Sequence, residues 1–155
     1  KVDDKNIELL KIAALFHDSG SIKVYKGHEE VGCEFVREIV PRYGFSPEDI
    51  EVICGIIMAT KIPQTPTTLL QRIICDADLD YLGRHDFKTI GDTLFKELNE
   101  QVMKLTEQEW DIMQVNFLEK HHYFTNSAIV LRDHLKQRHL DKLILATNEE
   151  NVKTI

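Results

Sequence analysis

Apolar residues recur at helical spacing in almost every segment of this chain, and no stretch shows the strict alternation of a β-strand. The clearest helix start is segment 46–49, where Ser46 can cap the helix, Pro47 suits its first position and Asp49 completes a capping box. Such a pattern predicts an all-α fold of about six to seven helices, with no sheet to organise them.

Length and composition fit one globular domain. The chain has 155 residues, of which 43% are hydrophobic and 29% charged, so a disordered or collagen-like chain is excluded. Its three cysteines form no CxxC pair, and we expect them to be reduced core thiols of a cytoplasmic protein; they are Cys33, Cys54 and Cys75.

The charge balance limits the partners that this chain can bind. With 19 Lys and Arg against 26 Asp and Glu, the formal net charge is −7, which argues against non-specific binding to duplex nucleic acid. No apolar run approaches the roughly 20 residues that span a bilayer, and no secretory signal is present. We therefore expect no membrane partner, and a homodimer stays open.

The segments between turn signals predict the order of the helices. We expect a single domain over residues 1–155, divided into a core at 7–84, further helices at 85–147 and a frayed tail at 148–155. The first helix is apolar almost all round and is expected to be central and buried. In chain order the predicted helices are 6–17, 28–43 with a kink at Pro41, 47–60, 69–82, 92–104, 107–121 and 126–146.

One carboxylate stands out on the predicted helix 69–82. At 100° per residue from Ile74, Asp78 falls about 40° away and lies inside the apolar arc, whereas Asp76 and Asp80 fall on the far side beside Arg72. A buried carboxylate needs a cation or strong donors, so Asp78 is a candidate ligand. Asp76 and Asp80 are expected to form a solvated face that pairs with Arg72.

Two histidines also fall on apolar stripes. His17 lies at the end of the predicted first helix and is joined to Asp18, while His28 opens the second helix. Taken alone, each is more often a capping or core histidine than a ligand. Lys23 and Lys26, in the loop before His28, can form an anion-binding cluster, although single lysines usually serve solubility. Of the remaining histidines, His121 and His122 are expected to end a helix, and His134 and His139 to be exposed.

Residues 14–20, ALFHDSG, resemble the core motif of the HD-domain metal-dependent phosphohydrolases, in which an apolar run precedes His-Asp-x-Gly. Residues 27–32, GHEEVG, resemble the segment that follows it, and Asp76-Ala77-Asp78 resembles the closing Ala-Asp of the motif. The resemblance covers about residues 7–84, and the C-terminal half is similar to the tail of a bacterial HD subfamily with no assigned substrate.

The resemblance implies an all-α HD-type domain with one divalent metal ion, which can be Mn²⁺, Fe²⁺, Mg²⁺, Ni²⁺ or Zn²⁺. By position the implied metal ligands are His17, Asp18 and Asp78, and Asp18 and His28 are the implied catalytic residues. Lys23, Lys26 and His28 are the implied substrate-binding residues. A small phosphorylated compound or nucleotide is the expected substrate, attacked by a metal-activated water.

Three departures from the family pattern bear on this hypothesis. The family's first histidine is expected upstream of Lys1, because nothing in residues 1–16 can replace it. Ser21 stands where the family often has a lysine. Segment 58–60 reads Met-Ala-Thr, where two-metal members carry another histidine, so one metal is predicted. The alternative hypothesis is a catalytically inactive HD-type signalling, ligand-binding or interaction module.

Overall fold

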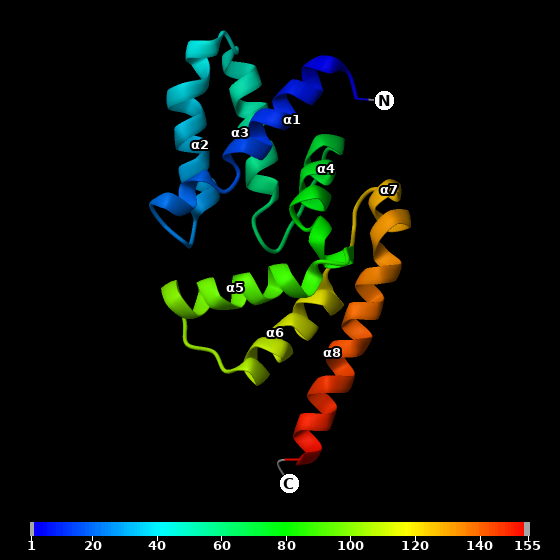
Figure 1. Cartoon of the computed structure of the whole chain (residues 1–155). Coiled ribbons are helices and arrows are strands. Elements are labelled where there is room, and N and C mark those ends of the chain that lie inside the picture. The colour runs from blue at the N-terminus through cyan, green and yellow to red at the C-terminus, as the bar shows by residue number, and fades with distance from the viewer. Residues whose placement is uncertain (1, 154–155) are drawn as a thin grey trace. The chain divides into compact units, whose positions relative to one another are not determined.

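The computed structural model describes the backbone of residues 2–153 and the side chains of residues 2–148. All regular elements in that part of the chain are helices, so the predicted all-α fold is confirmed (Figure 1). The chain divides into two compact units, Lys1–Asp78 and Leu79–Ile155. The predicted core ended six residues later, at 84, and the grouping of both halves into a single domain stays a prediction.

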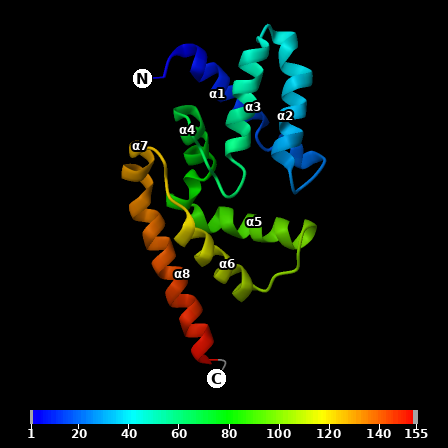
Figure 2. The same cartoon turned by 180° about the vertical axis from the view of Figure 1, so that it is seen from behind.

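The first unit consists of four helices and two short 3₁₀ turns. Figures 1 and 2 show α2 and α3 side by side from opposite directions, and α3 also packs against α1 and α4. Its core is made of completely or almost completely buried side chains, among them Val36, Ile53 and Ile57. The helices are α1 (Asp4–Phe16), α2 (His28–Ile39), α3 (Pro47–Ala59) and α4 (Leu69–Asp78).

Local chemistry explains how α2 gives way to α3. Pro41 ends the α-helical pattern, and the chain continues as a 3₁₀ turn from Val40 to Tyr43. Gly44 then adopts φ 84°, a conformation that costs glycine least. The capping box at Ser46 and Asp49 begins α3 with both of its reciprocal hydrogen bonds in place. These boundaries match the predicted ones closely.

The first helix is not buried as predicted. Only Leu9 and Ala13 of α1 are buried, whereas Ile7 is 37% exposed and Leu15 is 75% exposed. An apolar circumference allows packing on every side but does not ensure that neighbouring helices cover it. Instead, α1 buries one narrow stripe and leaves apolar side chains on its outer face.

The second unit contains a short 3₁₀ turn, Asp80–Gly83, and the remaining helices. Its core cluster consists of Leu82, Phe87, Leu118 and Leu140, and α6 packs along α8. The capping box of Thr106 and Glu109 begins α6, as predicted. The helices are α5 (Phe87–Gln101), α6 (Glu107–Lys120), α7 (Asn126–Ala128) and α8 (His134–Lys153), with a π-helical turn at Ile129–Asp133.

Three predicted boundaries in this unit differ from the structure. Helix α5 begins at Phe87 instead of residue 92, and Phe87 is a buried core residue. The single helix predicted over 126–146 is interrupted by the π turn, and α8 continues to Lys153. Most of the predicted frayed tail is therefore helical backbone, while residues 154–155 lie outside the described part of the chain.

The histidines of the second unit are placed partly as predicted. His121 is the C-cap of α6, and His134 is exposed. His139 is half-buried instead of exposed: it stacks on Phe87 with ring centroids 4.6 Å apart, and its Nε2 lies 2.9 Å from the Arg84 carbonyl oxygen. A sequence pattern of charged neighbours gave no sign of this aromatic partner.

The thiols of all three cysteines are buried in the first unit, as predicted. None of the helices that the structure describes is both long enough and apolar enough to cross a membrane.

Candidate metal centre

His17 is placed directly at the C-terminal end of α1, where it is the C-cap residue. Its Nδ1 lies 2.9 Å from the carbonyl oxygen of Ala14. Since a carbonyl oxygen only accepts hydrogen bonds, Nδ1 must carry the hydrogen in this contact. The Nε2 atom is therefore the nitrogen that His17 presents to other groups.

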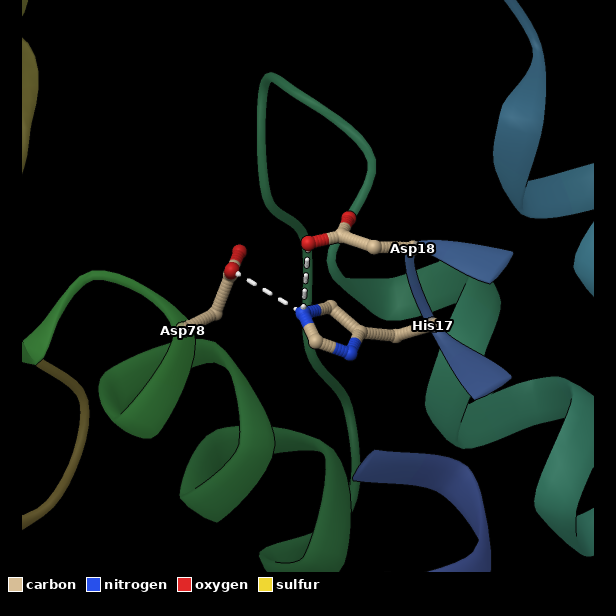
Figure 3. Close-up of side chains that lie close together, drawn as sticks. All are labelled: His17, Asp18 and Asp78. Carbon is tan, nitrogen blue, oxygen red and sulfur yellow. Dashed lines mark ion pairs between the residues drawn. The ribbon is translucent and has the colours of Figure 1, made fainter. Parts of the chain in front are cut away.

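Two carboxylates converge on that nitrogen (Figure 3). Asp18 Oδ2 lies 3.2 Å from His17 Nε2, and Asp78 Oδ1 lies 3.4 Å from it. One donor atom from each of the three residues falls within 4.8 Å of the other two. The structure thus brings together the end of α1 and the last residue of α4, which are about sixty residues apart in the sequence.

The electrostatics of the cluster favour a positive charge between the carboxylates. Hydrogen bonds to Asp18 and then to Asp78 raise the pKa of His17 to about 10, although burial opposes the shift. The hydrogen bond with His17 lowers the pKa of Asp18. Two carboxylates facing one imidazole nitrogen are stable only when a proton or another cation lies between them.

This donor set fits a divalent metal ion. Imidazole nitrogen and carboxylate oxygen are ligands for hard and borderline ions, with bond lengths of about 2.0–2.2 Å, so donors on one ion lie up to about 4.4 Å apart. The 4.8 Å limit of the cluster is close to that spacing. The Asp18 side chain is 67% exposed, which leaves one side of the cluster open to solvent.

His28 lies on the other side of Asp18. It is the first residue of α2, and its Nδ1 lies 2.9 Å from the carbonyl oxygen of Tyr25. Its Nε2 lies 3.4 Å from Asp18 Oδ1 and 3.6 Å from Glu29 Oε1. Asp18 therefore contacts His17 through one carboxylate oxygen and His28 through the other.

Two glycines allow α1 and α2 to approach closely enough for this arrangement. A Cβ atom on Gly20 would overlap the main-chain carbonyl group of His28, and one on Gly32 would lie 2.8 Å from the carbonyl oxygen of Phe16. Neither position has room for a side chain. Gly20 and Gly32 of the two motif segments are therefore explained by backbone contact between the segments that carry His17 and His28.

The two predicted substrate-binding lysines lie in the exposed segment before α2. Lys23 Nζ lies over the ring of Phe35, 4.6 Å from its centroid, and the Lys26 side chain is exposed. Among the described residues neither lysine forms an ion pair with the carboxylates of the cluster. Their assignment to substrate binding stays a prediction.

The predicted solvated face of Asp76 and Asp80 is wrong. Asp76 is buried, with 6% of its surface exposed, and it is more buried than Asp78. Helix α4 packs against both α1 and α3. A helical-wheel projection with a single apolar arc therefore could not predict which side chains of α4 are buried. Asp80 lies beyond the end of α4 and pairs with Arg132 at 2.6 Å and Arg84 at 3.6 Å instead of Arg72.

Sequence reasoning missed two residues near the cluster. Gln64 Nε2 donates to Asp78 Oδ2 at 3.3 Å, and the Glu29 side chain is only 8% exposed beside His28. Glu29 directly follows the motif histidine His28, and this was a weak indication that it lies near the site. Gln64 is a single polar residue in a proline-flanked loop, where helical periodicity carries no information.

Comparison with known proteins bears on the family. Neither curated proteins nor solved structures provide a match to this chain. A family model described as HD domain matches residues 1–80, a little over half of the chain. That match contains the three clustered residues and His28, so this chain belongs to the HD-domain family.

Proposed function

We propose that this protein is a metal-dependent phosphohydrolase that acts on a phosphate ester or nucleotide. The observation that carries the proposal is the convergence of His17 Nε2 with one oxygen each of Asp18 and Asp78, all within 4.8 Å. Asp18 and Asp78 are like charges that face the same imidazole nitrogen, where they favour a cation between them. A divalent ion that takes the place of the proton on His17 Nε2 would interact with both carboxylates and give the cluster a chemical role.

His17, Asp18 and Asp78 are the residues that would hold the ion. When bound, a divalent ion lowers the pKa of a coordinated water to near neutrality and polarises a phosphoryl oxygen. The Ala14 carbonyl oxygen fixes His17 in the tautomer whose Nε2 faces the cluster. Asp18 joins this cluster to His28, because its two oxygens face different imidazoles.

His28 is suited to proton transfer. Its Nδ1 is engaged with the Tyr25 carbonyl oxygen, so Nε2 is the atom that gains or releases a proton. In that role His28 protonates the ester oxygen as its bond to phosphorus breaks, so that the leaving group departs as an alcohol, or donates a hydrogen bond to the phosphate. Lys26, exposed in the preceding segment, is available to attract the anionic substrate.

The proposal is tested with Asp78→Asn in the full chain, compared with Asp92→Asn. Asp92 is an exposed aspartate on α5 that pairs with Lys88 and lies outside the cluster, so it controls for loss of one carboxylate. We expect wild type and D92N to hold about one divalent ion per chain by elemental analysis. We expect D78N to lose both the ion and the hydrolysis of p-nitrophenyl phosphate and nucleotides.

Full hydrolysis by D78N would contradict the assignment of Asp78. A wild-type protein that carries no ion and hydrolyses no phosphate ester, yet binds nucleotides, would instead support the inactive ligand-binding module.

A further inference from the structure

The loop between α3 and α4, residues 60–68, contributes one side chain to the cluster. Gln64 is half-buried, and its Nε2 lies 3.3 Å from Asp78 Oδ2. The other oxygen of that carboxylate, Oδ1, faces His17 Nε2 at 3.4 Å. Each oxygen of Asp78 thus has its own partner, and the amide of Gln64 fixes the rotation of the carboxylate about its Cβ–Cγ bond.

Chemistry determines which end of the Gln64 amide faces Asp78. An ionised carboxylate only accepts hydrogen bonds, so it must meet the NH₂ group and not the carbonyl oxygen of the amide. The Oε1 atom of Gln64 consequently points elsewhere. It is buried and has no hydrogen-bond partner among the residues that the structure describes.

That buried acceptor makes Gln64 a poor choice for stability alone. A buried polar atom without a partner destabilises the folded state, whereas an apolar side chain of similar shape would not. The favourable contact of the side chain is the one to Asp78. Gln64 is therefore better explained by what it does for Asp78 than by packing of the loop.

The loop that carries Gln64 is anchored at both ends. Lys61 pairs with Glu30 of α2. At the other end Gln71 accepts hydrogen bonds from the backbone of Thr67 at 2.8 Å and Thr68 at 3.1 Å. Gln71 also donates to the Gly55 carbonyl oxygen at 3.1 Å, which ties the start of α4 to α3. These contacts limit the movement of the loop relative to α4.

A neutral amide suits this position better than a charged donor. A lysine or arginine beside Asp78 would neutralise the carboxylate and compete with a cation for it. The amide of Gln64 orients the carboxylate and leaves its negative charge available to the cluster.

From this geometry we propose that Gln64 is a positioning residue of the metal centre: its amide directs Asp78 Oδ1 toward His17 and Asp18. The inference rests on the proposed function, because it assumes that this cluster holds a metal ion. Partners that orient a ligand typically contribute about 10–100-fold to metal affinity.

The test compares Gln64→Leu with Gln137→Leu in the full chain. Gln137 lies on α8 and its Nε2 donates to Asp141 at 3.0 Å, so it offers the same residue and the same kind of contact outside the cluster. We expect Q64L to raise the Mn²⁺ dissociation constant about 10–100-fold in titration calorimetry. Q137L is expected to bind like wild type.

Stability of the metal-free protein separates positioning from packing. After treatment with EDTA, Q64L is expected to unfold at the same urea concentration as wild type or higher, because leucine removes the partnerless acceptor. If Q64L does not fold, Gln64→Met keeps an unbranched side chain without the donor and is expected to weaken Mn²⁺ binding equally. Wild-type Mn²⁺ affinity in either folded variant would overturn the proposal.

Failure of the proposed function is a different outcome. Wild type that binds Mn²⁺ but hydrolyses no phosphate ester would contradict the proposed hydrolase activity. The Mn²⁺ affinities of Q64L, Q137L and wild type would still test the positioning role of Gln64. If wild type binds no Mn²⁺, the metal-free crystal structure of Q64L tests whether Gln64 positions Asp78. An Asp78 carboxylate turned away from His17 supports the positioning role, and an unmoved carboxylate overturns it.

Discussion

His17 and His28 make the same side-chain contact with their own backbone, although they belong to different segments of the chain. Each ring engages a carbonyl oxygen three residues earlier through Nδ1, at 2.9 Å in both cases, and turns Nε2 toward Asp18. The tautomer of each histidine is therefore set by its own backbone. What differs is the second carboxylate, which is Asp78 for His17 and Glu29 for His28.

This difference predicts separate effects of the two histidines. Because His28 does not contact Asp78, His28→Gln should keep the bound divalent ion and lower kcat for phosphate esters by about 10²-fold or more. His17→Gln should lose the ion. Elemental analysis alongside steady-state kinetics checks both expectations, and loss of the ion in H28Q would make His28 a metal ligand.

Cys33 supplies a prediction about pH. Burial, reinforced by the neighbouring Cys54, raises the pKa of the Cys33 thiol from 9.0 to about 12. The folded state therefore keeps a proton that the unfolded state loses above pH 9, so stability falls as the pH rises from about 9 toward 12. The decrease in urea midpoint between pH 8.5 and 10.5 should be smaller in Cys33→Ala, and identical slopes would contradict this account.

Asp78 and Gln64 show which site residues could be predicted from the sequence and which could not. Asp78 was identified because helical spacing placed a carboxylate among apolar residues, and the structure brings it to His17 and Asp18. Gln64 lies in an irregular loop, where its approach to Asp78 depends on the path of the chain between α3 and α4. No local pattern encodes that path.

At the scale of elements, helix ends were predicted better than helix faces. Capping boxes are local chemistry, and both predicted boxes form with reciprocal hydrogen bonds. Faces depend on neighbours, and for this reason α1 was expected to be more buried than it is, while Asp76 on α4 was expected to be exposed. One helix end was also missed, because α4 ends at Asp78 and not at residue 82, and Asp80 beyond it pairs with Arg132.

The surroundings of two glycines in the first unit predict opposite effects when each is replaced by alanine. Gly20→Ala should destabilise the fold strongly, because its Cβ would overlap the His28 carbonyl group and push α2 away. Gly55→Ala should be neutral or stabilise α3 by up to about 1 kcal/mol, since alanine favours helix and the nearest atom would be an ordinary 3.6 Å away.

Urea unfolding measures both variants, with metal removed so that only the fold contributes. A Gly20→Ala protein as stable as wild type would show that the segments carrying His17 and His28 are not held in backbone contact.

At the scale of the whole molecule, the HD-domain match and the first compact unit almost coincide, at residues 1–80 and 1–78. All three residues of the candidate metal cluster lie in that unit, together with His28 and Gln64. The second unit has its own core of Leu82, Phe87, Leu118 and Leu140. Family resemblance predicted the content of the first unit, and the sequence offered no comparable motif for the second.

Metal binding should increase the thermal stability of the chain. An ion that binds only the folded state stabilises it by about 2.7 kcal/mol at a free concentration 100 times Kd. We expect Mn²⁺ to raise the Tm of wild type and EDTA to reverse the increase, while D78N should respond to neither. The same increase in D78N would show that Mn²⁺ binds elsewhere.

Anomalous diffraction from crystals of the full chain grown with Mn²⁺ examines the central idea most directly, because it locates the ion without assuming any activity. We predict one strong anomalous peak about 2.0–2.3 Å from His17 Nε2, Asp18 Oδ2 and Asp78 Oδ1. A peak bound to other residues, or no peak at these three side chains at saturating Mn²⁺, would contradict it.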